Sequence, residues 1–204
     1  MNHLYEQLTA LKLTGFRDAL KKQLAQPGTY QELGFEERLS LLTAEELTCR
    51  ENRKAERLIK HARFRLNAEL SKLDYRNNRG LDRALIRSLS QGNWLTLKQN
   101  ILLTGATGSG KTFLACALGH NACRQGYKVY YYRLKALMEQ CYQGHADGRY
   151  SKLLTRLNNS DLLLLDDWGL EPLSSEQRSD LLEIVDLMYQ RGSIIVVSQL
   201  PVEN

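Results

Sequence analysis

A glycine-rich segment of eight residues constrains this chain more than any other feature. It runs from Gly105 to Thr112 and has the form G-x-x-x-x-G-K-T. The glycines allow backbone N–H groups to curl around phosphate oxygens, and the N-terminus of a following helix adds partial positive charge. An apolar run precedes the segment and a helix-forming run follows it, which is the context that gives the pattern meaning. The segment therefore predicts a phosphate-binding loop at a strand-to-helix junction.

The residue types in this loop indicate ATP with Mg²⁺ as the ligand. Lys111 can reach the β- and γ-phosphates, and the hydroxyl of Thr112 can bind Mg²⁺. A glycine-rich turn that binds nothing is the alternative, and the Lys-Thr pair in register argues against it. We expect the whole loop to contact the nucleotide: Gly105, Ala106, Thr107, Gly108, Ser109, Gly110, Lys111 and Thr112.

The hydrophobic pattern changes character near residue 92, so the sequence predicts two domains. Residues 1–92 have helical spacing and predict a helical N-terminal domain, with two short helices at 66–73 and 81–89. Residues 93–204 alternate short apolar strands with helices, which is typical of a parallel α/β sheet. Strands are expected at 100–104, 128–133, 161–166 and 193–198, and helices after the loop and at 134–142, 150–158 and 174–190.

Polar side chains follow two of these strands. Asp166 and Asp167 end a run of four leucines, and carboxyl ends of parallel strands border the ligand crevice of open α/β sheets. We expect Asp166 to hold the Mg²⁺ hydration shell with Thr112, and Asp167 to orient or deprotonate the attacking water. Ser198 and Gln199 end another strand and could lie beside the γ-phosphate. The predicted catalytic set is therefore Lys111, Asp167, Ser198 and Gln199.

Positive charge is concentrated before the predicted sheet. Residues 50–87 carry 12 Lys or Arg against 5 Asp or Glu, and the spacing places several on one helical face. Such a face can neutralise DNA phosphates without reading sequence. A solvated charged face is the alternative, which Glu51 and Glu56 support. The candidate DNA contacts are Arg50, Arg53, Lys54, Arg57, Lys60, Arg65, Arg76 and Arg79.

Other patterns are better explained by packing or by their surroundings. Cys116, His120 and Cys123 share one helical face, and burial of small side chains is a better explanation than a metal site that lacks a fourth ligand. The run Tyr130–Arg133 could stack on single-stranded bases, but tyrosines also suit a strand.

The N-terminus has no apolar core typical of a signal peptide, and no segment is long enough to span a bilayer. We expect a cytoplasmic protein without membrane contact.

Together these motifs resemble those of the AAA+ ATPases. Gly105–Thr112 corresponds to Walker A, Leu162–Asp167 to Walker B and Ser198-Gln199 to sensor I. Within that superfamily the chain looks like the IstB-type helper ATPases of insertion sequences, which are relatives of the DnaC helicase loaders. The likeness spans nearly the whole chain and rests also on flanking stretches: Leu73-Asp74-Tyr75, Arg79–Arg83, Asn93-Trp94, Asn100–Gly105, Asp166–Gly169 and Ser198–Pro201.

The resemblance implies a P-loop parallel sheet in which the sensor strand lies between the two Walker strands. It also implies assembly on duplex DNA, a homo-oligomer with the ATP site at the subunit interface, and cooperation with a transposase. Asp167 departs from the glutamate of most AAA+ proteins, so we expect slow hydrolysis. The sequence stops at Asn204, before the family's arginine finger, fifth strand and lid, so we expect the fold to be incomplete there and turnover to be weak.

Three other functions stay open. A helicase loader of the DnaC type would share the ATPase core and differ in the partner of its N-terminal domain. A small-molecule kinase also uses a P-loop, but it would need an acceptor pocket and has little use for a basic helical region. A binding module that uses ATP only as an assembly ligand is consistent with Asp167 and a missing arginine finger.

Overall fold

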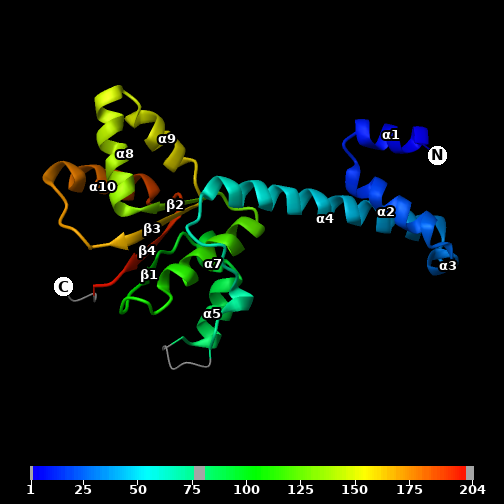
Figure 1. Cartoon of the computed structure of the whole chain (residues 1–204), viewed down its shortest axis with the longest axis horizontal. Helices are drawn as coiled ribbons and strands as arrows, with labels where there is room; N and C mark the ends of the chain where they lie inside the picture. The colour runs from blue at the N-terminus through cyan, green and yellow to red at the C-terminus, as the bar shows by residue number, and fades with distance from the viewer. Residues whose placement is uncertain (1, 76–80, 201–204) are drawn as a thin grey trace. The chain divides into compact units, whose positions relative to one another are not determined.

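The computed structural model describes residues 2–75 and 81–200, and they form two compact units (Figure 1). The first unit ends at Glu56 and the second begins at Arg57, so the division falls inside α4 (Phe35–Ala62). The sequence pattern placed this division at residue 92. The structure places it earlier because apolar residues between positions 57 and 92, such as Phe64 and Ile86, pack into the core of the second unit.

The first unit is helical. It comprises α1 (Asn2–Ala10), α2 (Thr14–Ala25), α3 (Pro27–Tyr30) and the first part of α4. At Gly15, α2 lies so close to α4 that an added Cβ would stand 2.6 Å from Cβ of Cys49. The backbone N–H of Phe16 donates to Oε2 of Glu46 at 3.0 Å. A glycine at this contact thus allows two helices to pack backbone against side chain.

The second unit contains a four-stranded parallel sheet. Its strands are β1 (Ile101–Leu103), β2 (Val129–Arg133), β3 (Leu162–Trp168) and β4 (Ser193–Ser198), in the order β1-β4-β3-β2. The predicted α/β fold is confirmed, and so is the implied position of the sensor strand β4 between β1 and β3. All four strands end at the same edge of the sheet, which therefore gathers the polar residues that follow them.

Helices cover both faces of this sheet (Figure 1). On one face lies α7 (Lys111–Arg124), with α5 (Arg83–Ser90) and α6 (Asn93–Thr96) packed into the same cluster. The other face is covered by α8 (Leu134–Asp147), α9 (Tyr150–Asn158) and α10 (Ser175–Met188). Successive β3 residues alternate between the faces: Leu162 and Leu164 pack toward α7, and Leu163 and Leu165 toward α8–α10.

Residues 63–75, which follow α4, take an extended path along α7. The prediction of a helix at 66–73 is wrong, since only a 3₁₀ turn, η1 (Leu70–Lys72), forms there. Arg63 takes a φ of 56° directly after α4 and turns the chain, and Phe64 and the fully buried Ala68 then contact the core. An extended segment spaces Phe64 and Ala68 more widely than a helix would.

Among the described residues, no helix is both long and apolar enough to cross a membrane.

Candidate functional site

The loop Gly105–Thr112 connects β1 to α7 and folds around the ammonium group of Lys111. Gly105, Gly108 and Gly110 have φ values of 144°, 78° and 95°, which side chains with a Cβ rarely adopt. Nζ of Lys111 donates to the carbonyl oxygens of Gly105 at 2.7 Å and Ala106 at 2.8 Å. The glycines thus allow the backbone of the loop to curl, and the carbonyl oxygens of the curled loop hold the ammonium group of Lys111 in place.

Asp166 lies where β3 meets the start of α7. The alternation along β3 puts Asp166 on the same face as Leu164, so the buried carboxylate points toward α7. Its Oδ1 accepts from the hydroxyl of Thr112 at 3.2 Å, and its Oδ2 accepts from the hydroxyl of Tyr131 at 2.7 Å. A hydroxyl and a carboxylate side by side are oxygen ligands that suit Mg²⁺. These residues therefore fit the predicted Mg²⁺ site.

Tyr131 on β2 supports this carboxylate. Burial raises the pKa of the Tyr131 phenol, and the hydrogen bond to Asp166 and the Asp166 charge raise it further. The phenol therefore stays protonated at neutral pH and keeps donating to Asp166. The sequence pattern indicated only that the tyrosines at 130–132 fill a strand, and they do lie in β2.

Asp167 has a different conformation and different partners. The register between β3 and β4 shifts between Leu165 and Trp168, and Asp167 takes a φ of 59° within this irregularity. Its Oδ2 accepts a hydrogen bond from Nε of Arg133 at 2.5 Å, and Nη1 of Arg65 lies 3.7 Å away. Two guanidinium groups thus surround the carboxylate that we expect to orient water.

The two polar residues at the end of β4 face different neighbours. Gln199 accepts through Oε1 from the hydroxyl of Thr107 at 2.6 Å, which links the strand end to the loop. Ser198 is buried and donates to the carbonyl of Trp168 at 3.2 Å. The backbone N–H of Leu200 donates in turn to Oγ of Ser198 at 3.0 Å. Gln199 is therefore the one of the two whose side chain contacts the phosphate-binding loop.

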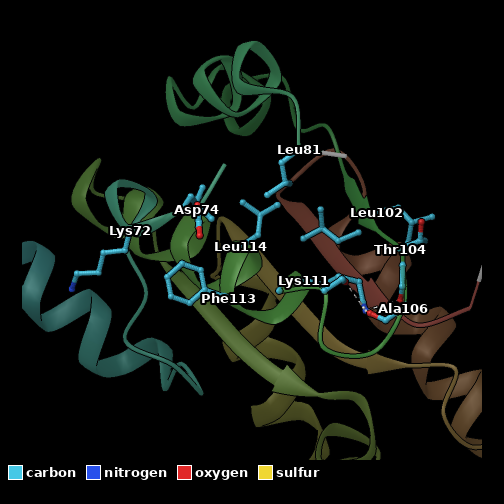
Figure 2. Close-up of a pocket in the computed structure, with 14 residues that line it drawn as sticks. Lys72, Asp74, Leu81, Leu102, Thr104, Ala106, Lys111, Phe113 and Leu114 are labelled. Atoms are coloured by element: carbon cyan, nitrogen blue, oxygen red, sulfur yellow. Dashed lines mark hydrogen bonds between the residues drawn. The ribbon is translucent and has the colours of Figure 1, made fainter. Parts of the chain in front are cut away.

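Two cavities border the loop. The first, of about 400 Å³, is lined by both aspartates, Gln199, Arg65 and most of the loop, namely Thr107, Gly108, Gly110, Lys111 and Thr112. The second, of about 650 Å³, lies along the other side of the loop and is lined by apolar side chains with Lys72 and Asp74 (Figure 2). Leu81, Leu102 and Leu114 face this second cavity in Figure 2, and they give it an apolar wall beside the lysine.

The described candidate DNA contacts divide between α4 and the segment that follows it. Arg50, Arg53, Lys54, Arg57 and Lys60 are exposed along α4, where Nε of Arg50 also pairs with Oε1 of the buried Glu46 at 2.7 Å. Arg65 lies instead beside the aspartates of the loop site. Arg76 and Arg79 lie outside the described residues.

Sequence reasoning missed Tyr131 and Arg133 as site residues, and it assigned Arg65 to DNA. Their positions follow from pairing between strands, since Arg133 lies opposite Asp166 in the β2–β3 register. A basic residue ending one strand and an acidic residue ending another were the available signal. Cys116, His120 and Cys123 are all buried on α7, as the packing interpretation predicted.

Comparisons with known proteins agree with this geometry. The chain is 46% identical to the ATP-binding protein ascribed to insertion sequence IS1162 of Pseudomonas fluorescens, over 98% of this chain and 86% of that protein. It is 42% identical to an ATP-binding protein ascribed to an insertion sequence of Sinorhizobium fredii, over 97% and 80% of the two chains.

Solved structures of replication proteins share the fold. A DnaC helicase loader matches with a TM-score of 0.58 and 28% identity, over 68% of this chain and 80% of that one. AMPPCP-bound DnaA from Aquifex aeolicus matches with a TM-score of 0.60 and 22% identity, over 68% and 43%. A family model described as IstB-like ATP binding protein matches residues 6–204. The chain therefore belongs to the IstB-like family of AAA+ ATP-binding proteins.

Proposed function

We propose that this protein is an ATPase that assembles on duplex DNA and assists a transposase in DNA transposition. The observation that carries the ATPase part is the meeting of Thr112, Asp166 and Asp167 at the sheet edge beside the Lys111 loop. The names of its relatives, which refer to insertion sequences, support the transposition part.

The residues of the site divide the chemistry among them. Lys111 and the backbone N–H groups of its loop bind the phosphates, and Gln199 fixes the loop through Thr107. Thr112 and Asp166 would hold Mg²⁺, which neutralises phosphate charge when bound. Asp167 orients the attacking water, or accepts its proton, once its carboxylate is released from Arg133. Tyr131 keeps Asp166 aimed at Thr112.

The second cavity suits the base of the nucleotide. It lies beside the loop, has an apolar wall that includes Leu81 and Phe113, and contains the carboxylate of Asp74 (Figure 2). A flat heteroaromatic ring is stabilised by apolar contact with a few polar groups that fix its orientation. We therefore assign the adenine to this cavity and the γ-phosphate to the one near Asp167.

The exposed basic residues of α4 are the proposed contacts to duplex DNA, largely independent of sequence. Five of the candidates are exposed on this helix: Arg50, Arg53, Lys54, Arg57 and Lys60. Contacts to backbone phosphates supply affinity that falls steeply with salt. A homo-oligomer with ATP at the subunit interface and a cytoplasmic location complete the proposal, which follows the IstB resemblance.

A helicase loader is the second candidate function. It is favoured by the structural match to a DnaC loader, whose sequence is 28% identical over the matched region. The two candidates share the ATPase site and differ in the protein partner. A pull-down with the transposase of the same element and with a replicative hexameric helicase separates them, since each function predicts capture of one partner.

DNA binding measured with ATP, ADP and no nucleotide, at several salt concentrations, tests the proposal. We expect ATP to strengthen binding to duplex DNA, and Lys54→Gln with Lys60→Gln to weaken it and reduce the salt slope by about 0.9 for each lost phosphate contact. Lys22→Gln with Lys152→Gln removes two exposed lysines elsewhere and is the matched control. Binding that does not depend on nucleotide would contradict the assembly model, and no DNA binding at all would favour a kinase.

A further inference from the structure

Arg65 occupies a position in the loop site that its place in the sequence does not suggest. It lies three residues after the end of α4 and lines the same cavity as Lys111, Thr112, Asp166, Asp167 and Gln199. Its Nη1 is 4.0 Å from Oδ2 of Asp166 and 3.7 Å from Oδ2 of Asp167. These distances exceed hydrogen-bond length, so the charge faces the carboxylates without being locked to them.

The backbone on both sides of Arg65 is anchored to α7. The ring of Phe64 packs over Gly119, where an added Cβ would stand 2.5 Å from Cε1 of the ring, and it lies 4.4 Å from the ring of His120. The buried Cys116 lies against the backbone of Arg65 and Leu66. Because α7 begins with Lys111 and Thr112, one helix positions both the phosphate-binding loop and Arg65.

The two arginines near Asp167 differ in how they are held. Arg133 donates a short hydrogen bond to the Asp167 carboxylate, which fixes its guanidinium. Arg65 makes longer ion pairs, with Asp166 and Asp167, and about half of its side chain is exposed. A guanidinium presents several N–H donors in a planar fork that matches phosphate oxygens, so it exchanges a distant carboxylate for a phosphate at little cost.

We propose that Arg65 binds the γ-phosphate of ATP within the same chain and thereby distinguishes ATP from ADP. The proposal rests on the proposed ATP-binding function and adds a residue that no motif contains. It also reassigns Arg65 from DNA contact to nucleotide contact, while the exposed residues of α4 keep the DNA role proposed above.

Nucleotide affinities of three variants test this proposal. Arg65→Gln removes the charge, Arg65→Lys keeps it without the planar fork, and Arg63→Gln changes a neighbouring exposed arginine that does not line the cavity. Titration calorimetry with Mg²⁺ and either ADP or a non-hydrolysable ATP analogue measures each affinity. We expect Arg65→Gln to weaken analogue binding about 10- to 100-fold and ADP binding less than about twofold, as for one lost hydrogen bond to a charged group. Arg65→Lys should fall between, and Arg63→Gln should match the wild type.

The other outcomes overturn the proposal in different ways. Equal losses of affinity for both nucleotides would make Arg65 a structural residue. Thermal unfolding of the variant would then show a lowered melting temperature. Unchanged affinities would mean that Arg65 only balances the carboxylate charge. Lys111→Ala is the control that should bind neither nucleotide. A wild-type chain that binds neither nucleotide would refute ATP binding itself. A wild type that binds ATP, with an Arg65→Gln variant that lacks the expected selective loss, would refute this inference alone.

Discussion

Arg133 holds the side chain of Asp167, since its Nε donates a hydrogen bond to Oδ2 of the carboxylate at 2.5 Å. Arg133 is the last residue of β2 and lies opposite Asp166 in the neighbouring parallel strand β3, next to Asp167. The hydrogen bond to Asp167 raises the pKa of the Arg133 guanidinium, and the Asp167 charge raises it further. Arg133 is therefore always charged, and in this arrangement the carboxylate that would act on water is engaged by a cation.

Arg133→Gln should raise hydrolysis of ATP in the absence of DNA. Removing the cation frees Asp167 to orient water, and the gain should be no more than about fivefold because solvent screens the exposed guanidinium of Arg133. Phosphate release at saturating ATP measures the effect. Arg133→Lys, which keeps the charge but loses the planar fork, should stay closer to the wild type. A variant slower than wild type would show that Arg133 assists the reaction.

Asp167 itself should be needed for hydrolysis and not for binding. Asp167→Asn should retain nucleotide affinity and lower kcat by about 100-fold or more, the usual contribution of a positioned base. Asp167→Glu should hydrolyse ATP faster than the wild type, because the longer side chain reaches further toward the water. Unchanged turnover in Asp167→Asn would remove this residue from the mechanism and strengthen the alternative in which ATP is only an assembly ligand.

The sequence predicted most of the sheet because each strand is a short apolar run with a polar end. Leu162–Leu165 are buried on both faces, so their pattern is continuous and the position of Asp166 follows directly. The glycines and Lys111 form a motif whose function depends on local backbone geometry, which is why the loop could also be predicted from neighbouring residues alone.

Residues placed by long-range contacts could not be predicted in this way. Arg133 and Tyr131 reach the site through the register of β2 on β3, which neither strand specifies by itself. Arg65 was grouped with the basic residues of α4 because positive charge continues along the sequence. The helix ends at Ala62, however, and the left-handed conformation of Arg63 redirects the chain onto α7.

The stability of the second unit should fall in alkaline solution because of Cys123. Burial raises the pKa of this thiol from 9.0 to about 12. The folded state therefore binds the proton more tightly, and this contribution to stability is complete below about pH 9 and is lost as pH rises toward 12. By about pH 10.5 the loss should reach roughly 2 kcal/mol. Urea unfolding of the wild type and of Cys123→Ala across this range measures the free energy of unfolding at each pH. This free energy should fall less steeply with pH in the variant.

A matched control for the alkaline experiment is Cys49→Ala, which changes a partly buried cysteine of the first unit. A change of slope in Cys49→Ala as large as that in Cys123→Ala would show that the effect does not come from the buried Cys123 thiol. Equal slopes for wild type and Cys123→Ala would mean that the thiol ionises in the folded state without penalty, and therefore that water reaches it.

Gly119→Ala should destabilise the protein although alanine is the better helix former. Alanine gains up to about 1 kcal/mol in helix propensity, but its Cβ would lie 2.5 Å from Phe64, and overpacking of this kind costs about 1–3 kcal/mol. Phe64→Leu makes room, so Gly119→Ala introduced into that background should be neutral or stabilising. Urea unfolding of the two single variants and the double variant gives the coupling between the sites. Because Phe64 adjoins Arg65, Gly119→Ala should also weaken binding of the ATP analogue more than binding of ADP. If the Gly119→Ala variant were more stable than the wild type and bound both nucleotides with unchanged affinity, Phe64 would not anchor this segment.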